Sequence, residues 1–179
     1  MRIIGGKYKG HRLVSFNASH IRPTTDRVKE SIFNILMSEV PGAHVLDLFS
    51  GTGNLGIESL SREAEDVCFV EKNKKSLKIL KENLNKLKIK SNFEIYSEDV
   101  FSFLKKYSGK GFEVILIDPP FTEALGHSVM EALAGSKVLK EGSVVAIETA
   151  KKEKIEESYQ QLSLHKRKEF GDKILSIFV

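Results

Sequence analysis

The chain has 179 residues, with 28 lysines and arginines against 24 aspartates and glutamates, a net charge of +4. This length is enough for one domain with a substantial core, and no apolar run approaches the 18 residues of a membrane span. The first residues show no signal-peptide pattern, and Cys68 is the single cysteine. We therefore expect a cytoplasmic protein without disulfides, and no Cys or His cluster indicates a metal site.

Positive charge is concentrated near the start of the chain. Residues 1–30 hold seven basic and two acidic side chains, a net of +5, which leaves −1 for the rest. An arginine-rich patch on an otherwise neutral domain favours a nucleic-acid partner, although the solvated edge of a hairpin is the alternative. The candidate RNA-binding residues are Arg2, Lys7, Lys9, Arg12, Arg22 and Arg27.

The first 40 residues are predicted to form a small extension. Residues 2–4 and 12–14 have the pattern of two short strands joined by a glycine-containing turn, a β-hairpin. A loop over 22–26, with Thr24 or Thr25 as N-cap, leads into a helix with apolar residues at helical spacing.

From His44 onward, strands and helices alternate. This order indicates right-handed βαβ units and a mostly parallel sheet with helices on both faces. The predicted strands are 44–49, 67–71, 93–97, 112–118 and 143–148, and the predicted helices are 54–62, 73–89, 100–107 and 122–137.

The C-terminal part departs from this alternation. The lysine-rich segment 151–161 is predicted to be helical. Residues 162–170 and 173–179 have the pattern of two strands joined at Gly171-Asp172, a hairpin signal. The sequence therefore predicts an α/β fold with a seven-stranded, mostly parallel sheet and an antiparallel pair at one edge.

A glycine-rich turn follows the first strand of this core. Gly51, Gly53 and Gly56 match the dinucleotide pattern GxGxxG, which allows a close approach of ligand to a helix N-terminus. Glu71 ends the next strand 20 residues after Gly51, where a ribose-binding acid belongs. Such an acid serves both NAD and S-adenosylmethionine enzymes, and the alternative is a solvated charge at a strand end.

Two further motifs follow later strands. Asp99 and Val100 suit an adenine amino group and ring, although Asp99 also suits a helix N-cap, and the two roles are compatible. In Asp118-Pro119-Pro120-Phe121 the prolines stop the strand and leave a carboxylate, carbonyls and an aromatic ring at its carboxyl end. Open parallel sheets bind their ligands at the carboxyl ends of the strands. A carboxylate, carbonyls and an aromatic ring at that end suit a nucleobase with an exocyclic amine. An ordinary turn is the alternative.

Together these motifs resemble a class I S-adenosylmethionine-dependent methyltransferase with a Rossmann-like fold that acts on an amino nitrogen. A dehydrogenase has no need of the Asp-Pro-Pro-Phe motif. Nearly the whole chain is similar to the RsmD-type family, bacterial enzymes that methylate the N2 amine of one guanine in 16S ribosomal RNA. The segments that carry the resemblance are 2–10 (RIIGGKYKG), 22–34 (RPTTDRVKESIFN), 46–58 (LDLFSGTGNLGIE), 118–121 (DPPF) and 171–177 (GDKILSI).

The resemblance implies a role for each motif. Asp118 and the Pro119 carbonyl would accept hydrogen bonds from the amine, within the catalytic Asp118-Pro119-Pro120-Phe121 segment. Phe121, which is tyrosine in some relatives, would stack on the base, and the segment Arg22 to Arg27 would close over the cofactor and meet the RNA. The implied cofactor-binding residues are Asp47, Ser50, Gly51, Thr52 and Gly53 for the methionine part, Glu71 for the ribose, and Asp99 and Val100 for the adenine.

The resemblance also implies how the protein is organised and what it binds. It would be a single methyltransferase domain, with residues 1–40 as the basic extension and 41–179 as the Rossmann-like core. It would act without a metal, as a monomer, on small-subunit rRNA within an assembled or partly assembled ribosomal subunit, and yield S-adenosylhomocysteine. The alternatives are methylation of adenine N6 in RNA or DNA, a non-catalytic RNA-binding ribosome-assembly factor, and an NAD oxidoreductase.

Overall fold

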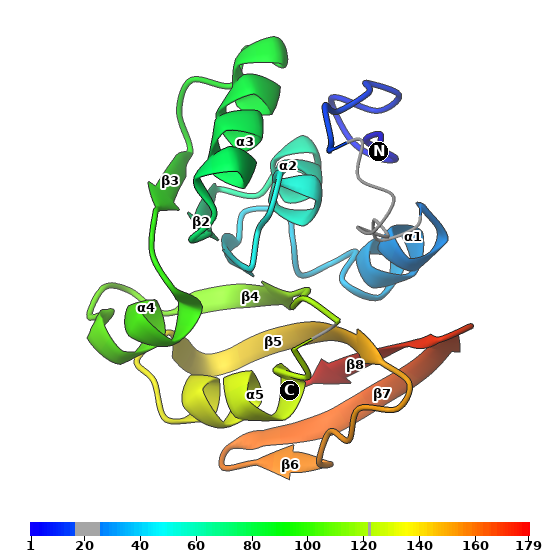
Figure 1. Cartoon of the computed structure of the whole chain (residues 1–179), viewed down its shortest axis with the longest axis vertical. Helices are drawn as coiled ribbons and strands as arrows, with labels where there is room; N and C mark the ends of the chain where they lie inside the picture. Colours follow the sequence, from blue (N-terminus) through cyan, green and yellow to red (C-terminus); the bar gives the residue numbers. More distant parts are fainter. Residues whose placement is uncertain (17–25, 122) are drawn as a thin grey trace.

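The computed structural model describes residues 1–16, 26–121 and 123–179. Within these residues, one sheet has eight strands in the order β3-β2-β1-β4-β5-β8-β7-β6 (Figure 1). The strands are β1 (His44–Leu48), β2 (Asp66–Val70), β3 (Phe93–Tyr96), β4 (Phe112–Ile117), β5 (Leu139–Ala150), β6 (Ser158–Tyr159), β7 (Leu162–Phe170) and β8 (Lys173–Phe178). Strands β1 to β5 are parallel, and β8, β7 and β6 continue the sheet as antiparallel neighbours. The predicted α/β fold is confirmed.

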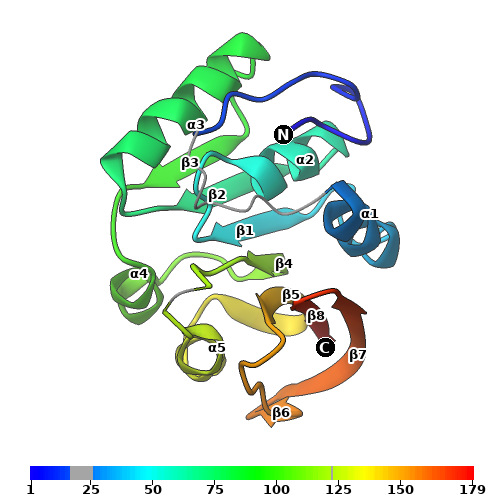
Figure 2. The ribbon, with the colours of Figure 1, turned by 45° about the vertical axis from the view of Figure 1, so that its right-hand side comes forward.

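Helices cover both faces of the sheet. The described helices are α1 (Asp26–Ile35), α2 (Asn54–Ser61), α3 (Lys74–Lys86), α4 (Val100–Lys106) and α5 (Gly126–Ala134). Helices α1, α2 and α3 lie on one face, and α4 and α5 on the other (Figure 2). In β4, Val114 packs toward the first group and Ile115 toward the second, which is why residues 114–117 are all apolar. None of these helices is both long and apolar enough to cross a membrane.

The N-terminal hairpin is shorter than predicted. It is reduced to one antiparallel bridge between Arg2 and Arg12, supported by the hydrogen bond from the Ile3 N–H to the His11 carbonyl at 2.9 Å. The loop between them lies against the end of α2, where the Lys7 N–H donates to the Ser61 carbonyl at 2.7 Å. The predicted caps Thr24 and Thr25 lie outside the described residues.

The prediction of a helix over 151–161 is wrong. The segment makes turns and then the short strand β6, which pairs with β7 and gives the sheet its eighth strand. Only Ile155 and Tyr159 are large apolar residues there, too few for a helix to bury a face, so sheet pairing prevails over helix propensity. The helix predicted over 122–137 is limited to Gly126–Ala134, and the strand predicted over 143–148 extends to Leu139–Ala150.

Candidate active site

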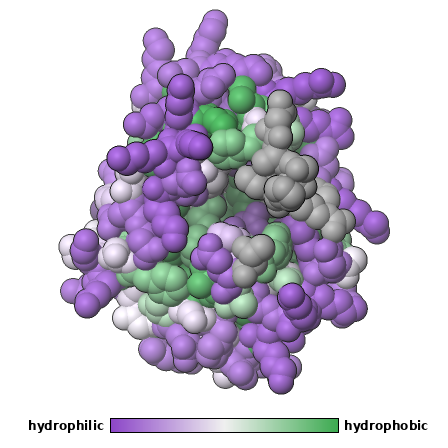
Figure 3. Space-filling view, in the orientation of Figure 1, coloured by the Kyte–Doolittle hydropathy of each residue, from purple (hydrophilic) through white to green (hydrophobic). Residues whose placement is uncertain are grey.

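A cavity of about 1060 Å³ lies at the carboxyl ends of the parallel strands. The face shown in Figure 3 is hollowed at its centre, where hydrophobic residues are surrounded by hydrophilic ones. The cavity wall includes segments that follow β1, β2, β3 and β4, the edge at which open parallel sheets bind ligands. It brings together ten of the predicted site residues: Ser50, Gly51, Thr52, Glu71, Asp99, Val100, Asp118, Pro119, Pro120 and Phe121.

The glycine-rich turn and the start of α2 each have one position that packs too closely for a residue larger than glycine. Gly53 has a φ of +88° and precedes α2, and a Cβ there would lie 2.4 Å from the Leu80 Cδ1. A Cβ at Gly56 would lie 2.2 Å from the Phe69 Cε1. These glycines therefore allow the start of α2 to pack directly against Leu80 of α3 and Phe69 of β2. Beside them the Ser50 Oγ is buried and has no hydrogen-bond partner among the described residues, which suits a bound polar group.

Asp47 lies behind this turn and is absent from the cavity wall, as is Gly53. The Asp47 carboxylate is buried, and its Oδ2 accepts the Gly56 N–H at 2.8 Å. The pKa of Asp47 is raised to about 8, chiefly by burial; the Gly56 hydrogen bond lowers it, and the charges of Asp118 and Glu71 raise it. In this structure Asp47 contacts the start of α2, so any effect on a ligand passes through the turn.

The acids after β2 and β3 both line the cavity and are both held by backbone N–H groups. Glu71 accepts the Gly51 N–H at 2.9 Å and the Asn73 N–H at 2.7 Å, so it joins the two loops. Asp99 is the N-cap of α4 and accepts the Phe101 N–H at 3.0 Å. The N-cap alternative for Asp99 is therefore confirmed, and its adenine contact stays a prediction.

The Asp118–Phe121 turn lies against residues to which the sequence analysis gave no role in the site. The Lys173 Nζ lies 4.3 Å from the centroid of the Phe121 ring and forms an ion pair with Glu148. Glu148 follows an apolar run in β5, and Lys173 opens β8, where Ser176 is the other polar residue. Those two isolated charges are the signal that could have marked the pair in the sequence.

Phe49 is a second residue that the sequence analysis missed. It lines the cavity with a φ of +58°, in the left-handed region that a bulky side chain seldom adopts. Backbone outliers of this kind concentrate at functional sites, but only the structure shows this one.

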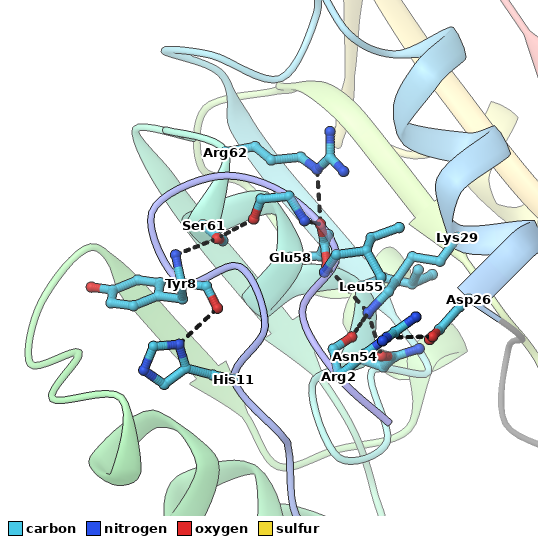
Figure 4. Close-up of polar contacts among 12 residues, drawn as sticks. Arg2, Tyr8, His11, Asp26, Lys29, Asn54, Leu55, Glu58, Ser61 and Arg62 are labelled. Atoms are coloured by element: carbon cyan, nitrogen blue, oxygen red, sulfur yellow. Dashed lines mark hydrogen bonds and ion pairs between the residues drawn. The ribbon is translucent and has the colours of Figure 1, made fainter.

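The basic extension borders the cavity. Met1, Ser15 and Phe16 line it, whereas the predicted RNA-binding residues of the described part do not. Lys29, which contributes to the charge of residues 1–30, is buried and pairs with Glu58 at 3.2 Å (Figure 4). The exposed candidates are Arg2, Lys7, Lys9, Arg12 and Arg27, and Arg22 lies outside the described residues.

The sheet order, the antiparallel β8 and the cavity beside the glycine turn define a Rossmann-like fold of the class I methyltransferase type. Solved structures of methyltransferases share this fold. The family model described as "Conserved hypothetical protein 95" matches residues 1–179, and the chain belongs to this family. The resemblance to the RsmD-type family is confirmed.

Named relatives agree with this assignment. The chain is 39% identical over 153 residues to ribosomal RNA small subunit methyltransferase D of Haemophilus influenzae, which covers 84% of this chain and 79% of that one. It is 33% identical to the putative rRNA methyltransferase YlbH of Bacillus subtilis, over 96% and 94% of the two chains. The solved structure of a putative methyltransferase, yhhF, from Escherichia coli has a TM-score of 0.88 at 31% identity and covers 99% of this chain and 96% of that one.

Proposed function

We propose that this protein transfers a methyl group from S-adenosylmethionine to the exocyclic N2 amine of one guanine in bacterial small-subunit rRNA. The observation that carries the proposal is one cavity wall shared by the Asp118–Phe121 turn, the glycine turn, Glu71 and Asp99. The names of the relatives support rRNA as the substrate class. Guanine N2 rests on the family resemblance alone.

The residues of the cavity fit the cofactor. Its volume of about 1060 Å³ suits a ligand of nucleoside size with room for a base beside it. In this proposal Ser50, Gly51 and Thr52 hold the methionine part, and Asp47 and Gly53 support that loop from behind. Glu71 binds the ribose hydroxyls, and Asp99 with Val100 binds the adenine. When bound, S-adenosylmethionine supplies a methyl group made electrophilic by its sulfonium, and S-adenosylhomocysteine remains.

The target amine needs orientation more than it needs a strong base. The lone pair of a guanine amine is delocalised into the ring, so the amine is a weak nucleophile. Two acceptors, the Asp118 carboxylate and the Pro119 carbonyl, favour a pyramidal nitrogen and point its lone pair at the methyl group. Positioning and the local field then account for most of the acceleration. The proton leaves after transfer, so Asp118 need not abstract it first.

Stacking on Phe121 holds the base outside its helix, an interaction worth about 1–3 kcal/mol per base. The substrate nucleotide is therefore in a loop or is extruded from its stack. The exposed arginines and lysines of the extension bind RNA phosphates near the cavity mouth. We propose that the protein works in the cytoplasm as a monomer on an assembled or partly assembled small subunit.

The test is transfer of labelled methyl from S-adenosylmethionine to small-subunit particles from cells that lack the endogenous enzyme, followed by nucleoside analysis. We expect a single N2-methylguanosine. N6-methyladenosine would replace the proposed target and keep the reaction class. Absence of transfer to particles and to naked RNA, despite measured cofactor binding, would contradict the proposal and favour a non-catalytic assembly factor.

A further inference from the structure

A buried ion pair lies behind the Phe121 ring. Lys173 is at the start of β8 and Glu148 is near the end of β5, on antiparallel neighbours in which Lys173 is paired with Ala150. Their side chains are 5% and 1% exposed, and the Lys173 Nζ donates to the Glu148 Oε1. The second oxygen of Glu148 has no hydrogen-bond partner among the described residues. Sheet formation does not require this pair, because a pair of apolar side chains at such positions is often as stable or more stable.

The pair is joined to the proposed base site through the aromatic ring. At 4.3 Å from the ring centroid, the Lys173 ammonium is within cation–π distance of Phe121. Lys173 also lines the cavity, and Phe121 is only half-buried. A ring held by a cation on one face offers its other face to a base.

The Asp118 carboxylate, the proposed acceptor for the amine of the base, lies in the same region. Burial raises the pKa of Glu148 to about 7, and the charge of Asp118 is the next cause. Asp118 and Glu148 therefore lie close enough to repel each other, and the Lys173 ammonium offsets part of that repulsion. Lys173 thus contacts the Phe121 ring and also reduces the negative charge around Asp118.

We infer that Lys173, anchored by Glu148, is a positioning residue for the target base. It fixes the plane of the Phe121 ring, so that a base stacked on the other face brings its amine to Asp118. This inference rests on the proposed function and adds the residues that set the geometry of the base. It predicts a defect in using the RNA substrate with little effect on cofactor binding.

The test compares Lys173→Met, Lys173→Arg and the double variant Lys173→Met/Glu148→Gln. The double variant keeps side-chain shape and leaves no unpaired buried charge, so its unfolding in urea should remain close to that of the wild type. Lys140→Met is the matched control, because Lys140 also forms a cross-strand ion pair, with Glu113 at the other end of β4. The measurements are kcat and KM on unmethylated small-subunit particles, particle binding with S-adenosylhomocysteine present, and the affinity for S-adenosylhomocysteine.

We expect Lys173→Met and the double variant to lose about tenfold in kcat/KM and in particle affinity, and Lys173→Arg to recover most of it. The affinity for S-adenosylhomocysteine should change by less than about twofold. A fully active double variant, beside an active wild type, would overturn this inference and leave the proposed function standing. An equal loss of S-adenosylhomocysteine affinity would also overturn it. An inactive wild type that binds cofactor would overturn the proposed function and this inference with it.

Discussion

The Asp47 Oδ2 on β1 and the Gly56 N–H on α2 are joined by a 2.8 Å hydrogen bond, and a Cβ on Gly56 would lie 2.8 Å from that same oxygen. The helix therefore starts as close to the strand as the hydrogen bond allows. This contact sets the position of the glycine turn, which precedes it in the chain.

Gly56→Ala should push α2 away from β1. The added methyl also meets the Phe69 ring, so we expect a loss of about 1–3 kcal/mol of stability and weaker binding of S-adenosylhomocysteine. Urea unfolding and calorimetry measure the two effects. Gly135→Ala is the control, because a Cβ added there would lie 3.8 Å from its nearest neighbour, the Gln160 Nε2. Stability equal to that of the wild type would contradict the close packing.

The stability of the protein should depend on pH through Asp47. Because burial raises the pKa of Asp47 from 3.8 to about 8, the folded state holds its proton more tightly than the unfolded state does. The stabilisation is present below pH 4 and is lost as the pH rises to about 8. Asp47→Asn removes this titration and keeps an oxygen acceptor for Gly56. We expect the variant to gain stability relative to the wild type from pH 5 to pH 8 in urea unfolding, and a constant difference would refute the assignment.

Asp118→Ala should abolish most methyl transfer while cofactor affinity is roughly kept. Loss of one oriented polar group at a reacting centre typically lowers kcat by about 10²–10³-fold. Asp118→Asn retains one acceptor oxygen and should be less impaired. Single-turnover transfer to small-subunit particles measures the effect, with S-adenosylhomocysteine calorimetry as the control. Unchanged activity in Asp118→Ala would remove the acceptor role.

The buried Lys29–Glu58 pair should be a major source of stability for the N-terminal extension. Glu58 also accepts the Ile4 and Gly5 N–H groups, and Lys29 also donates to the Arg2 carbonyl and to Asn54 (Figure 4). Lys29→Met leaves the buried Glu58 with the partly exposed Arg62 as its cation, at 2.9 Å, and we expect a loss of up to about 3–5 kcal/mol in urea unfolding.

The double variant Lys29→Met/Glu58→Gln should lose less than Lys29→Met alone, since it removes the buried charge of Glu58 and leaves only the partly exposed Arg62 without its ion-pair partner. Arg2→Ala is the matched control, because it breaks an exposed ion pair with Asp26 in the same extension. That change should lower stability by less than about 1 kcal/mol. Equal losses in Lys29→Met and Arg2→Ala would show that burial of the pair does not matter.

Arg12→Ala should weaken RNA binding in a salt-dependent way. Removal of one phosphate contact lowers the slope of log affinity against log salt by about one, so the loss is larger at low salt. Filter binding of small-subunit RNA at several salt concentrations measures the slope. Glu30→Ala serves as a control from the same basic region with the opposite charge. An unchanged slope in Arg12→Ala would exclude this residue from the interface.

Local sequence was enough to predict the parallel core and the loops at which the site forms. Strand and helix patterns placed Glu71, Asp99 and Asp118 at carboxyl strand ends, and the structure brings them to one cavity. Lys173 and Glu148 stand out in the sequence as isolated charges, but their pairing across 25 residues depends on the register between β5 and β8, which local sequence does not reveal. Lys29 was counted with the basic patch because charge alone does not reveal burial against Glu58.

The insertion of β8 between β5 and β7 also affects when the cavity wall can form during synthesis of the chain. Residues 173–178 are made after every parallel strand, yet they occupy an inner position of the sheet and supply part of the cavity wall. A nascent chain that already holds the glycine turn and the Asp118–Phe121 turn still lacks the lysine that contacts Phe121. The complete cavity wall can therefore assemble only after the segment that follows Gly171 has left the ribosome.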